Sequence, residues 1–226
     1  NISHDFRSPL TSIHGYAQAM LDGTIPYEAQ EKYLNIILSE TDRLTNLTSN
    51  LLELNSFNGD NVLLDITTFN ICETIVQTVN TLEGTAAKKE ISFVLDYNTQ
   101  KELLVEADES KIHQVLYNLI DNAVKFSHNN SEIKISLRKK GAKVFVSVKD
   151  SGIGIPKESL NKVFDRFYKT DISRGKDKRG TGLGLSISKE IIQAHNQTIN
   201  VVSTVDVGTE FVFTLKYHSK KQEASS

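Results

Sequence analysis

The sequence HQVLYNLIDNAVKF, residues 113–126, decides the fold. Its apolar residues recur at spacings of one, three and four, which predicts the buried side of a helix. They are Val115, Leu116, Leu119, Ile120 and Val124. Asn118 and Asn122 share another face, and Lys125 follows three residues after Asn122. Carboxamide oxygen suits Mg²⁺ and an ammonium group can neutralise phosphate charge, so this face is a candidate nucleotide site; solvated or capping asparagines are the alternative.

The segments around this helix combine strand and helix patterns. Alternating or β-rich runs occur in ISFVLDY at 91–97, at 133–137, at 144–148 and at 211–215. Helical patterns lie near 70–88, 109–127 and 182–195. The runs within 132–149 and 198–217 predict two antiparallel hairpins. We therefore predict an α+β domain over residues 62–218, an α/β sandwich with its helices on one face of the sheet.

A second polar motif is VSVKDSGIGIP, residues 146–156. An alternating strand ends at Asp150 and enters a turn that contains Gly152 and Gly154. Glycines let the backbone approach a flat ligand, and a carboxylate at the end of a strand can accept a hydrogen bond from an exocyclic amine such as that of adenine. The alternative is a tight turn in which the aspartate serves only the turn.

A third motif is RGTGLGLSIS, residues 179–188, in which Gly180, Gly182 and Gly184 lead into a helical pattern. Backbone N–H groups at the start of a helix bind anions such as polyphosphate. The spacing is neither a Walker loop nor a dinucleotide fingerprint. The loop before it is rich in cations, as a lid over phosphates would be, although a solvated loop is the alternative. These cations are Lys169, Arg174, Lys176, Lys178 and Arg179.

Residues 1–57 have the pattern of two helices instead. The first has an apolar face and ends near Gly23, and the second carries heptad-spaced apolar residues to about Phe57. The heptad positions are Ile37, Leu44, Leu47, Leu51 and Leu54. A two-helix hairpin buries too little apolar surface to be stable alone, so we expect 1–57 to dimerise as a four-helix bundle. We interpret residues 58–61 as a linker between the hairpin and the next domain, and we expect residues 219–226 to form a disordered tail.

On the first helix, His4 lies about 200° around the axis from Phe6, so we expect it to face water. Ser8 falls four residues after His4 and Asp5 is adjacent to it, so the three share one flank. A carboxylate beside an imidazole can hold one ring N–H and leave the other nitrogen nucleophilic, as phosphoryl transfer to histidine requires. An ordinary surface histidine is the alternative. Pro9 should bend the helix after His4.

The composition excludes several classes of function. The chain has 26 Lys and Arg against 28 Asp and Glu, so no overall positive field would attract nucleic acid or an anionic membrane. The single cysteine, Cys72, permits neither an intrachain disulfide nor a cysteine zinc site. No run approaches the ~20 apolar residues of a membrane span. Because the sequence opens without Met inside a helical pattern, we expect it to belong to a longer protein.

Together and in this order, the motifs resemble the sensor histidine kinases of two-component systems. SHDFRSPLTSI resembles their H box, NLIDNAVKF the N box, FDRFYK the phenylalanine box, and DSGIGIP and GTGLGL the two glycine boxes. The resemblance covers essentially all 226 residues. It implies a HisKA-type dimerisation and phosphoacceptor hairpin, followed by an ATP-binding domain of the Bergerat or GHKL type.

The resemblance also implies a role for each motif residue. His4 would be the phosphoacceptor, with Asp5 as its activating neighbour and Ser8 beside it. Asn122 would be the Mg²⁺ ligand. The residues implied to bind the nucleotide are Asn118, Asn122, Lys125, Phe126, Asp150, Gly152, Gly154, Lys169, Gly180, Thr181, Gly182, Leu183 and Gly184. Asp150 would bind the adenine amine, and the last three glycines would hinge the lid.

Some positions depart from related patterns. Members that dephosphorylate their partner usually have Thr or Asn where Ser8 stands, although a serine hydroxyl can also orient water. Lys169 stands where an arginine commonly contacts the γ-phosphate, so a point charge replaces a planar fork. After the last helix, AHNQT replaces the frequent glycine pair. Asn118 stands where related ATPases have a glutamate base, so we expect slow hydrolysis of ATP.

The implied function is Mg-ATP-dependent autophosphorylation of His4, followed by transfer of the phosphate to an aspartate of a response-regulator receiver domain, with phosphatase activity toward that regulator as an option. The alternatives are a dimeric pseudokinase scaffold and a hydrolysing ATPase of the same superfamily. We expect a homodimer through 1–57, and a cytoplasmic fragment of a membrane-anchored bacterial sensor that itself contacts neither membrane nor nucleic acid.

Overall fold

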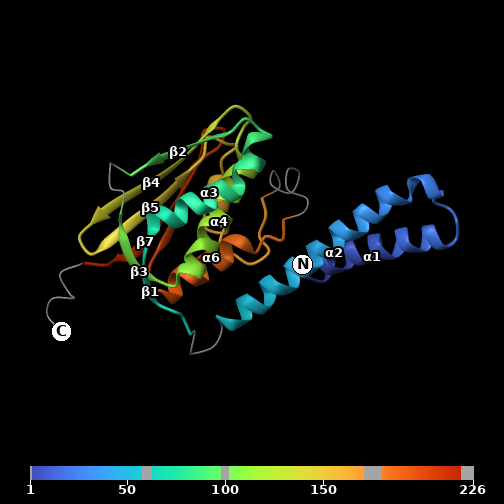
Figure 1. The fold of residues 1–226 in the computed structure, drawn as a ribbon, viewed down its shortest axis with the longest axis horizontal. Coiled ribbons are helices and arrows are strands. Elements are labelled where there is room, and N and C mark those ends of the chain that lie inside the picture. Colours follow the sequence, from blue (N-terminus) through green and yellow to red (C-terminus); the bar gives the residue numbers. More distant parts are fainter. Residues whose placement is uncertain (1, 58–62, 98–101, 171–179, 220–226) are drawn as a thin grey trace.

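A computed structural model describes residues 2–57, 63–97, 102–170 and 180–219, apart from the side chains of Ile2 and His4. The chain forms a long helical hairpin and an α/β domain, and Figure 1 shows the hairpin extending as an arm from the helical side of that domain. This arrangement confirms the predicted fold class. The predicted linker at 58–61 and most of the predicted tail lie outside the described residues.

The hairpin consists of α1 (Ile2–Leu21) and α2 (Gln30–Ser56), joined by a turn and the short 3-10 helix η1 (Tyr27–Ala29). Gly23 in the turn has a φ of 75°, a backbone conformation that favours glycine. Ile25 is buried there, and the rings of Tyr16 and Tyr33 pack with centroids 5.1 Å apart. The first helix ends two residues before the predicted end at Gly23, and the second ends one residue before the predicted end at Phe57.

The leucines of α2 divide into covered and uncovered positions. Leu47 and Leu54 are only 2% and 1% exposed and belong to one hydrophobic cluster with the buried side chains of the α/β domain. Other leucines of the hairpin stay open in the single chain, including Leu38 at 61% exposure and Leu52 at 71%. The α/β domain therefore covers part of the apolar surface that the heptad pattern assigned to the bundle.

The described strands of the α/β domain form a seven-stranded sheet in the order β1-β3-β7-β5-β4-β2, with β6 pairing to β7 outside this path. Most neighbours are antiparallel, including the predicted hairpins β4–β5 and β6–β7, whereas β2 and β4 are parallel. The strands are β1 (Thr67–Asn70), β2 (Ser92–Asp96), β3 (Leu104–Ala107), β4 (Glu132–Lys140), β5 (Lys143–Lys149), β6 (Ile199–Thr204) and β7 (Gly208–Tyr217).

Three longer helices cover one face of this sheet (Figure 1). They are α3 (Ile71–Ala87), α4 (Glu109–Phe126) and α6 (Gly184–Ala194), and a 3-10 turn, η2 (Lys157–Ser159), precedes α6. The core lies between these helices and the sheet, where the predicted apolar side of α4 is fully buried. Alternate residues of β4 and β5, such as Ile133, Ile135 and Val146, face it from the sheet. With its apolar side buried, α4 must present its polar side outward.

Candidate nucleotide-binding site

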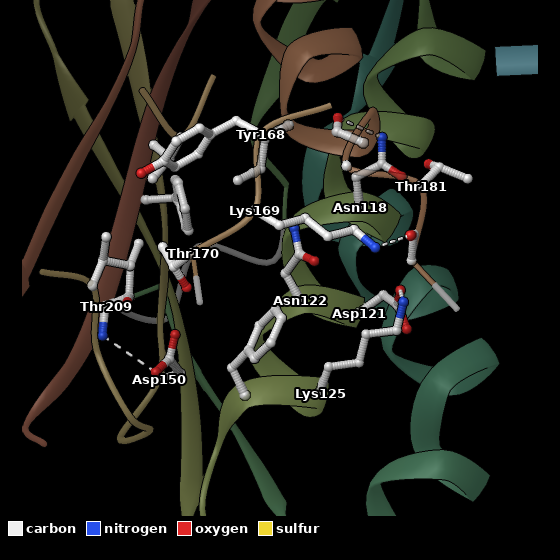
Figure 2. A pocket seen from close by; sticks show the side chains of 18 of the residues that line it. Asn118, Asp121, Asn122, Lys125, Asp150, Tyr168, Lys169, Thr170, Thr181 and Thr209 are labelled. Atoms are coloured by element: carbon white, nitrogen blue, oxygen red, sulfur yellow. Dashed lines mark hydrogen bonds and ion pairs between the residues drawn. The ribbon is translucent and has the colours of Figure 1, made fainter. Parts of the chain in front are cut away.

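A cavity of about 510 Å³ lies where the polar side of α4 faces the end of β5 and the segment that leads into α6. Figure 2 shows the side chains of these three regions converging on it. The cavity is lined by eleven of the thirteen residues that the sequence motifs assign to nucleotide binding. These are Asn118, Asn122, Lys125, Phe126, Asp150, Gly154, Lys169, Gly180, Thr181, Gly182 and Gly184.

Both ends of α4 are fixed by capping interactions. At its start, the Asp108 side chain accepts a hydrogen bond from the Lys111 backbone N–H at 3.1 Å. At its end, Lys89 Nζ donates to the carbonyl oxygens of Val124 and Lys125 at 2.8 and 2.7 Å. The helix therefore presents Asn118, Asn122 and Lys125 to the cavity from a fixed position.

The two asparagines of α4 are in different environments. Asn118 Nδ2 donates to the backbone oxygen of Gly184 at 3.1 Å, which ties α4 to the start of α6. The side chain of Asn122 projects into the cavity below Lys169 (Figure 2). Asn122 can therefore present its carboxamide oxygen to a ligand, whereas Asn118 holds the wall in place.

Lys125 forms an ion pair with Asp121, in which Nζ lies 2.7 Å from Oδ2. Asp121 also lines the cavity, and sequence reasoning missed it. Its position four residues before Lys125 was a usable signal, because residues at that spacing are neighbours on a helix. A bound phosphate would compete with the Asp121 carboxylate for the lysine.

Asp150 is only 6% exposed and lies at the opposite side of the cavity from Asn118 (Figure 2). Its Oδ1 accepts hydrogen bonds from the backbone N–H groups of Gly152 and Thr209 at 2.9 and 3.2 Å. Burial raises the pKa of the Asp150 carboxyl, and these two hydrogen bonds oppose the rise. No hydrogen bond to Oδ2 is found among the described residues, so that oxygen can accept one from a ligand. Thr209, on β7, was also missed, because only the tertiary fold brings it to Asp150.

The glycines near Asp150 allow backbone segments to pack closely. Gly152 does not line the cavity; a Cβ at this position would lie 2.3 Å from the backbone oxygen of Phe126. Gly154 does line it, has a φ of +68°, and a Cβ there would lie 2.1 Å from the oxygen of Thr204. Neither position accepts a side chain, so Gly152 lets its backbone pack against Phe126, and Gly154 forms part of the cavity wall through its backbone.

The segment before α6 accepts hydrogen bonds from two residues of the phenylalanine box, one from a backbone N–H and one from a side chain. Phe167 N–H donates to the oxygen of Gly182 at 3.0 Å, and Lys169 Nζ donates to the oxygen of Gly180. Gly182 has a φ of +71°. Leu183, which the motif assigns to nucleotide binding, is fully buried in the core and does not line the cavity. The predicted lid cations at 174–179 lie outside the described residues.

His4, Asp5 and Ser8 all lie in α1. The side chain of His4, which the sequence predicts to face water, lies outside the described part of the structure. Ser8 is exposed and its backbone oxygen accepts a hydrogen bond from Ser12 Oγ at 3.2 Å. Pro9 is inside the helix, as its sequence position requires.

The second helix of the hairpin also reaches the cavity, which sequence reasoning did not predict. Asn46 and Asn50 of α2 line it together with Gln114 and Tyr117 of α4. Among the described residues, no cluster of three or more His, Cys, Asp or Glu side chains could hold a metal ion. No helix in the described ranges is long and apolar enough to span a membrane.

Two family descriptions match the chain. Residues 107–219 match the histidine kinase-, DNA gyrase B-, and HSP90-like ATPase family, and residues 1–59 match the His Kinase A (phospho-acceptor) domain. The first match contains α4, Asp150 and the glycines before α6, and the second contains His4. The phospho-acceptor match contains both helices of the hairpin, and the ATPase match begins just before α4.

The curated relatives that resemble this chain are sensor kinases. The sensor histidine kinase WalK of Bacillus subtilis is 35% identical over 228 residues, which are 99% of this chain and 37% of that protein. The sensor protein kinase WalK of Staphylococcus aureus is 36% identical over 220 residues, which are 95% of this chain and 52% of that protein. The chain thus spans between about a third and a half of the length of these relatives.

Solved structures resemble the whole arrangement. The histidine kinase ThkA, in complex with the response regulator protein TrrA, matches with a TM-score of 0.77 at 32% identity, over 96% of this chain and 60% of that one. The Acinetobacter baumannii histidine kinase AdeS matches with a TM-score of 0.80 at 24% identity, over 96% and 98% of the two chains, and shows the shared fold.

Proposed function

This chain belongs to the sensor histidine kinases of two-component systems, and we propose that it binds Mg-ATP in the cavity beside α4 and transfers the γ-phosphoryl group to His4. One observation carries the proposal. Residues from three separate sequence motifs, represented by Asn122, Asp150 and Gly182, line a single cavity of about 510 Å³. That volume is in the range of small-molecule sites.

The adenine end of the nucleotide would lie at Asp150. Its buried carboxylate is fixed through Oδ1, so Oδ2 can accept a hydrogen bond from the exocyclic amine. Phe126 lines the same cavity and offers an aromatic surface to the base, and Gly154 lets the backbone approach it. The alternative of a simple turn at Asp150 does not explain why a carboxylate is buried in a cavity wall, where its charge is costly.

The phosphates would lie toward α4 and the glycines before α6. Lys125 and Lys169 both line the cavity and can neutralise phosphate charge. Asn122 supplies a neutral, hard oxygen of the kind that suits Mg²⁺. A bound Mg²⁺ ion would neutralise charge on the phosphates. Asn118 cannot act as a general base, because a carboxamide does not take up a proton at neutral pH, and its amino group is already used by Gly184. These features favour transfer to a protein group over hydrolysis.

In the transfer step, a ring nitrogen of His4 would attack the γ-phosphorus while the bond to the bridging oxygen breaks and ADP leaves. Asp5 would hold the N–H of the other ring nitrogen, so that the attacking nitrogen keeps its lone pair. Most of the rate acceleration would come from positioning and charge neutralisation. The phosphate would then pass to an aspartate of a receiver domain, as the structural match to a kinase bound to a response regulator supports. Ser8 would orient water if the same hairpin also dephosphorylates that regulator.

The hairpin would form a homodimer, since leucines along it are exposed in the single chain and a four-helix bundle would cover them. We also propose that the segment works in the cytoplasm as part of a longer, membrane-anchored sensor. The relatives extend far beyond the matched region, which leaves room for a sensing part and an anchor.

The decisive experiment is incubation with ATP labelled at the γ-phosphate, followed by mapping of acid-labile phosphate on the protein. We expect His4→Gln to abolish labelling and leave nucleotide affinity unchanged, because the imidazole only accepts the phosphate. His14→Gln, in the same helix, is the matched control and should label normally. Labelling of the His4→Gln chain would contradict the assignment. Absence of nucleotide binding would favour the scaffold, and phosphate release that far exceeds labelling would favour the hydrolysing ATPase.

A further inference from the structure

Part of the cavity wall comes from the hairpin, and none of the sequence motifs contains those residues. Asn46 and Asn50 lie one turn apart on α2, so they share one face of that helix. Both line the cavity together with Gln114, Tyr117 and Asp121 of α4. We infer that Asn46 and Asn50 are nucleotide-binding residues that contact the phosphate end of ATP, an inference that rests on the proposed function.

Glu53 fastens α2 to α4 next to these asparagines. Its Oε1 accepts a hydrogen bond from Lys111 Nζ at 2.7 Å, and its Oε2 accepts one from Gln114 Nε2 at 2.6 Å. The bond to Lys111 is also an ion pair, in which the two side chains are 17% and 33% exposed. Both carboxylate oxygens are therefore held in a partly buried setting, where such contacts are stronger than on an open surface.

Further contacts hold the end of α2, next to Glu53, against the α/β domain. Glu53 follows Asn46 by seven residues and Asn50 by three, which places all three on one side of α2. Leu54, beside Glu53, is almost fully buried within the cluster that includes the α/β domain. The Lys111 ammonium also lies 5.9 Å from the ring centroid of Phe57. The end of α2 is therefore held by both polar and apolar groups, and Glu53 acts as a positioning residue for the asparagines.

The location of this wall indicates which part of the nucleotide it meets. Gln114, which binds Glu53, lies one turn before Asn118 on the same side of α4. Asn118 and Asp150 lie toward opposite sides of the cavity (Figure 2). Because Glu53, on the same side of α2, bonds to Gln114, we place Asn46 and Asn50 in the part of the cavity away from Asp150. The Lys169 side chain extends toward that part, where it donates to the oxygen of Gly180 (Figure 2). Carboxamide N–H groups there can donate to phosphate oxygens without adding charge.

This arrangement links nucleotide binding to the position of the hairpin. If ATP contacts two side chains of α2, binding of ATP stabilises the docked hairpin, and by reciprocity any movement of α2 that removes those contacts weakens binding of ATP. His4 is on the helix that pairs with α2, so the helical hairpin that accepts the phosphate would also report whether the cavity holds a triphosphate.

The test is calorimetry of Mg-ATP and of adenosine on the intact chain. Asn46→Ala combined with Asn50→Ala should weaken ATP binding about tenfold and leave adenosine binding unchanged, because only phosphate contacts are lost. Asn35→Ala, an exposed asparagine of the same helix outside the cavity, is the matched control and should bind both ligands normally. Equal ATP affinities in the double variant and the wild type would overturn the inference.

A charge exchange tests the role of Glu53. Glu53→Lys should weaken ATP binding to a similar extent with adenosine binding retained, and Glu53→Lys combined with Lys111→Glu should recover most of the loss. Glu31→Lys, an exposed position on α2, controls for the added charge. Failure of the combined exchange to recover ATP affinity in a chain with normal helical circular dichroism would contradict the positioning role. A wild-type chain that binds no ATP would contradict the proposed function itself, a result distinct from either of these.

Discussion

Asp150 is the residue at which burial and charge oppose each other most clearly. Its carboxyl group is 6% exposed, and two backbone N–H groups offset only part of the loss of water, so its pKa is raised. A raised pKa in the folded state means that the carboxylate form lowers stability at pH values above it, and that this cost is relieved as the pH falls. The protein keeps a destabilising group here, as is common at binding sites.

The pH dependence of nucleotide binding should reflect this group. Protonation removes the charge that holds the adenine amine, so ATP affinity should fall as the pH drops through the raised pKa of Asp150, at a higher pH than for an ordinary aspartate. Asp150→Asn should weaken ATP binding at least tenfold at neutral pH and remove this acidic loss of affinity, while an amide oxygen still accepts from Gly152 and Thr209. Calorimetry across pH measures both effects. A variant that retains the wild-type pH profile would show that another group is responsible.

At the scale of single elements, α4 has the most constrained position. Its apolar side is buried against the sheet, its start is capped by Asp108, and its last turn is held by Lys89 from the connection between α3 and β2. A positive charge near the last carbonyls of a helix is favourable because of the helix dipole. The same last turn carries Lys125 and Phe126, so its stability and the shape of the cavity depend on one another.

Removal of the lysine cap should affect both properties. Lys89→Met should lower the free energy of unfolding by about 1–2 kcal/mol and weaken Mg-ATP binding several-fold, because the last turn of α4 loses its donor. Lys88→Met, at the exposed neighbouring position, is the control and should change neither quantity. Urea unfolding and calorimetry measure the two effects. Unchanged stability in the Lys89 variant would show that water replaces the ammonium group without cost.

At the scale of the whole molecule, the elements that were predicted correctly are those with long periodic patterns. The helix at 109–127 and the hairpins at 132–149 and 198–217 follow from spacings near 3.6 and 2, which local sequence displays directly. β1 and β3 were not predicted, because each has only four residues and pairs with strands far away in the sequence: β1 with β3, and β3 with both β1 and β7. Short strands of this kind depend on tertiary pairing rather than on local sequence.

The residues of the candidate site also fall into those that local sequence predicts and those that only the tertiary fold reveals. Asn122, Asp150 and the glycines follow from motifs, since Asn122 lies on one face of a helix, Asp150 follows a recognisable strand, and the glycines lie in the segments next to such elements. Thr209 and Asn50 do not, because nothing near them in the sequence indicates that β7 passes Asp150 or that α2 reaches the cavity. The predicted seam of the hairpin also needed the fold, which buries Leu47 and Leu54 with the α/β domain.

Assembly of the molecule can be tested through the leucines that stay open. Leu38→Lys, at a position 61% exposed on α2, should weaken self-association about a hundredfold, because a charge would enter the proposed four-helix bundle. Leu63→Lys, at the 95% exposed Leu63 outside the hairpin, is the control and should leave the dimer intact. Analytical ultracentrifugation over a range of concentrations measures the self-association of both variants. A Leu38 variant that dimerises like the wild type would place the interface elsewhere.

The position of β7 has a consequence for how the chain is made. This strand lies inside the sheet, where it pairs with β3, β5 and β6, yet it is the last strand among the described residues. During translation, the ribosome releases β3 and β5 long before their shared neighbour, so a nascent chain holds an unfinished sheet with exposed strand edges, which are prone to aggregation. The α/β domain can complete its core only once synthesis has passed Tyr217, and the end of α2 must wait with it, because Leu47 and Leu54 are buried in that same core.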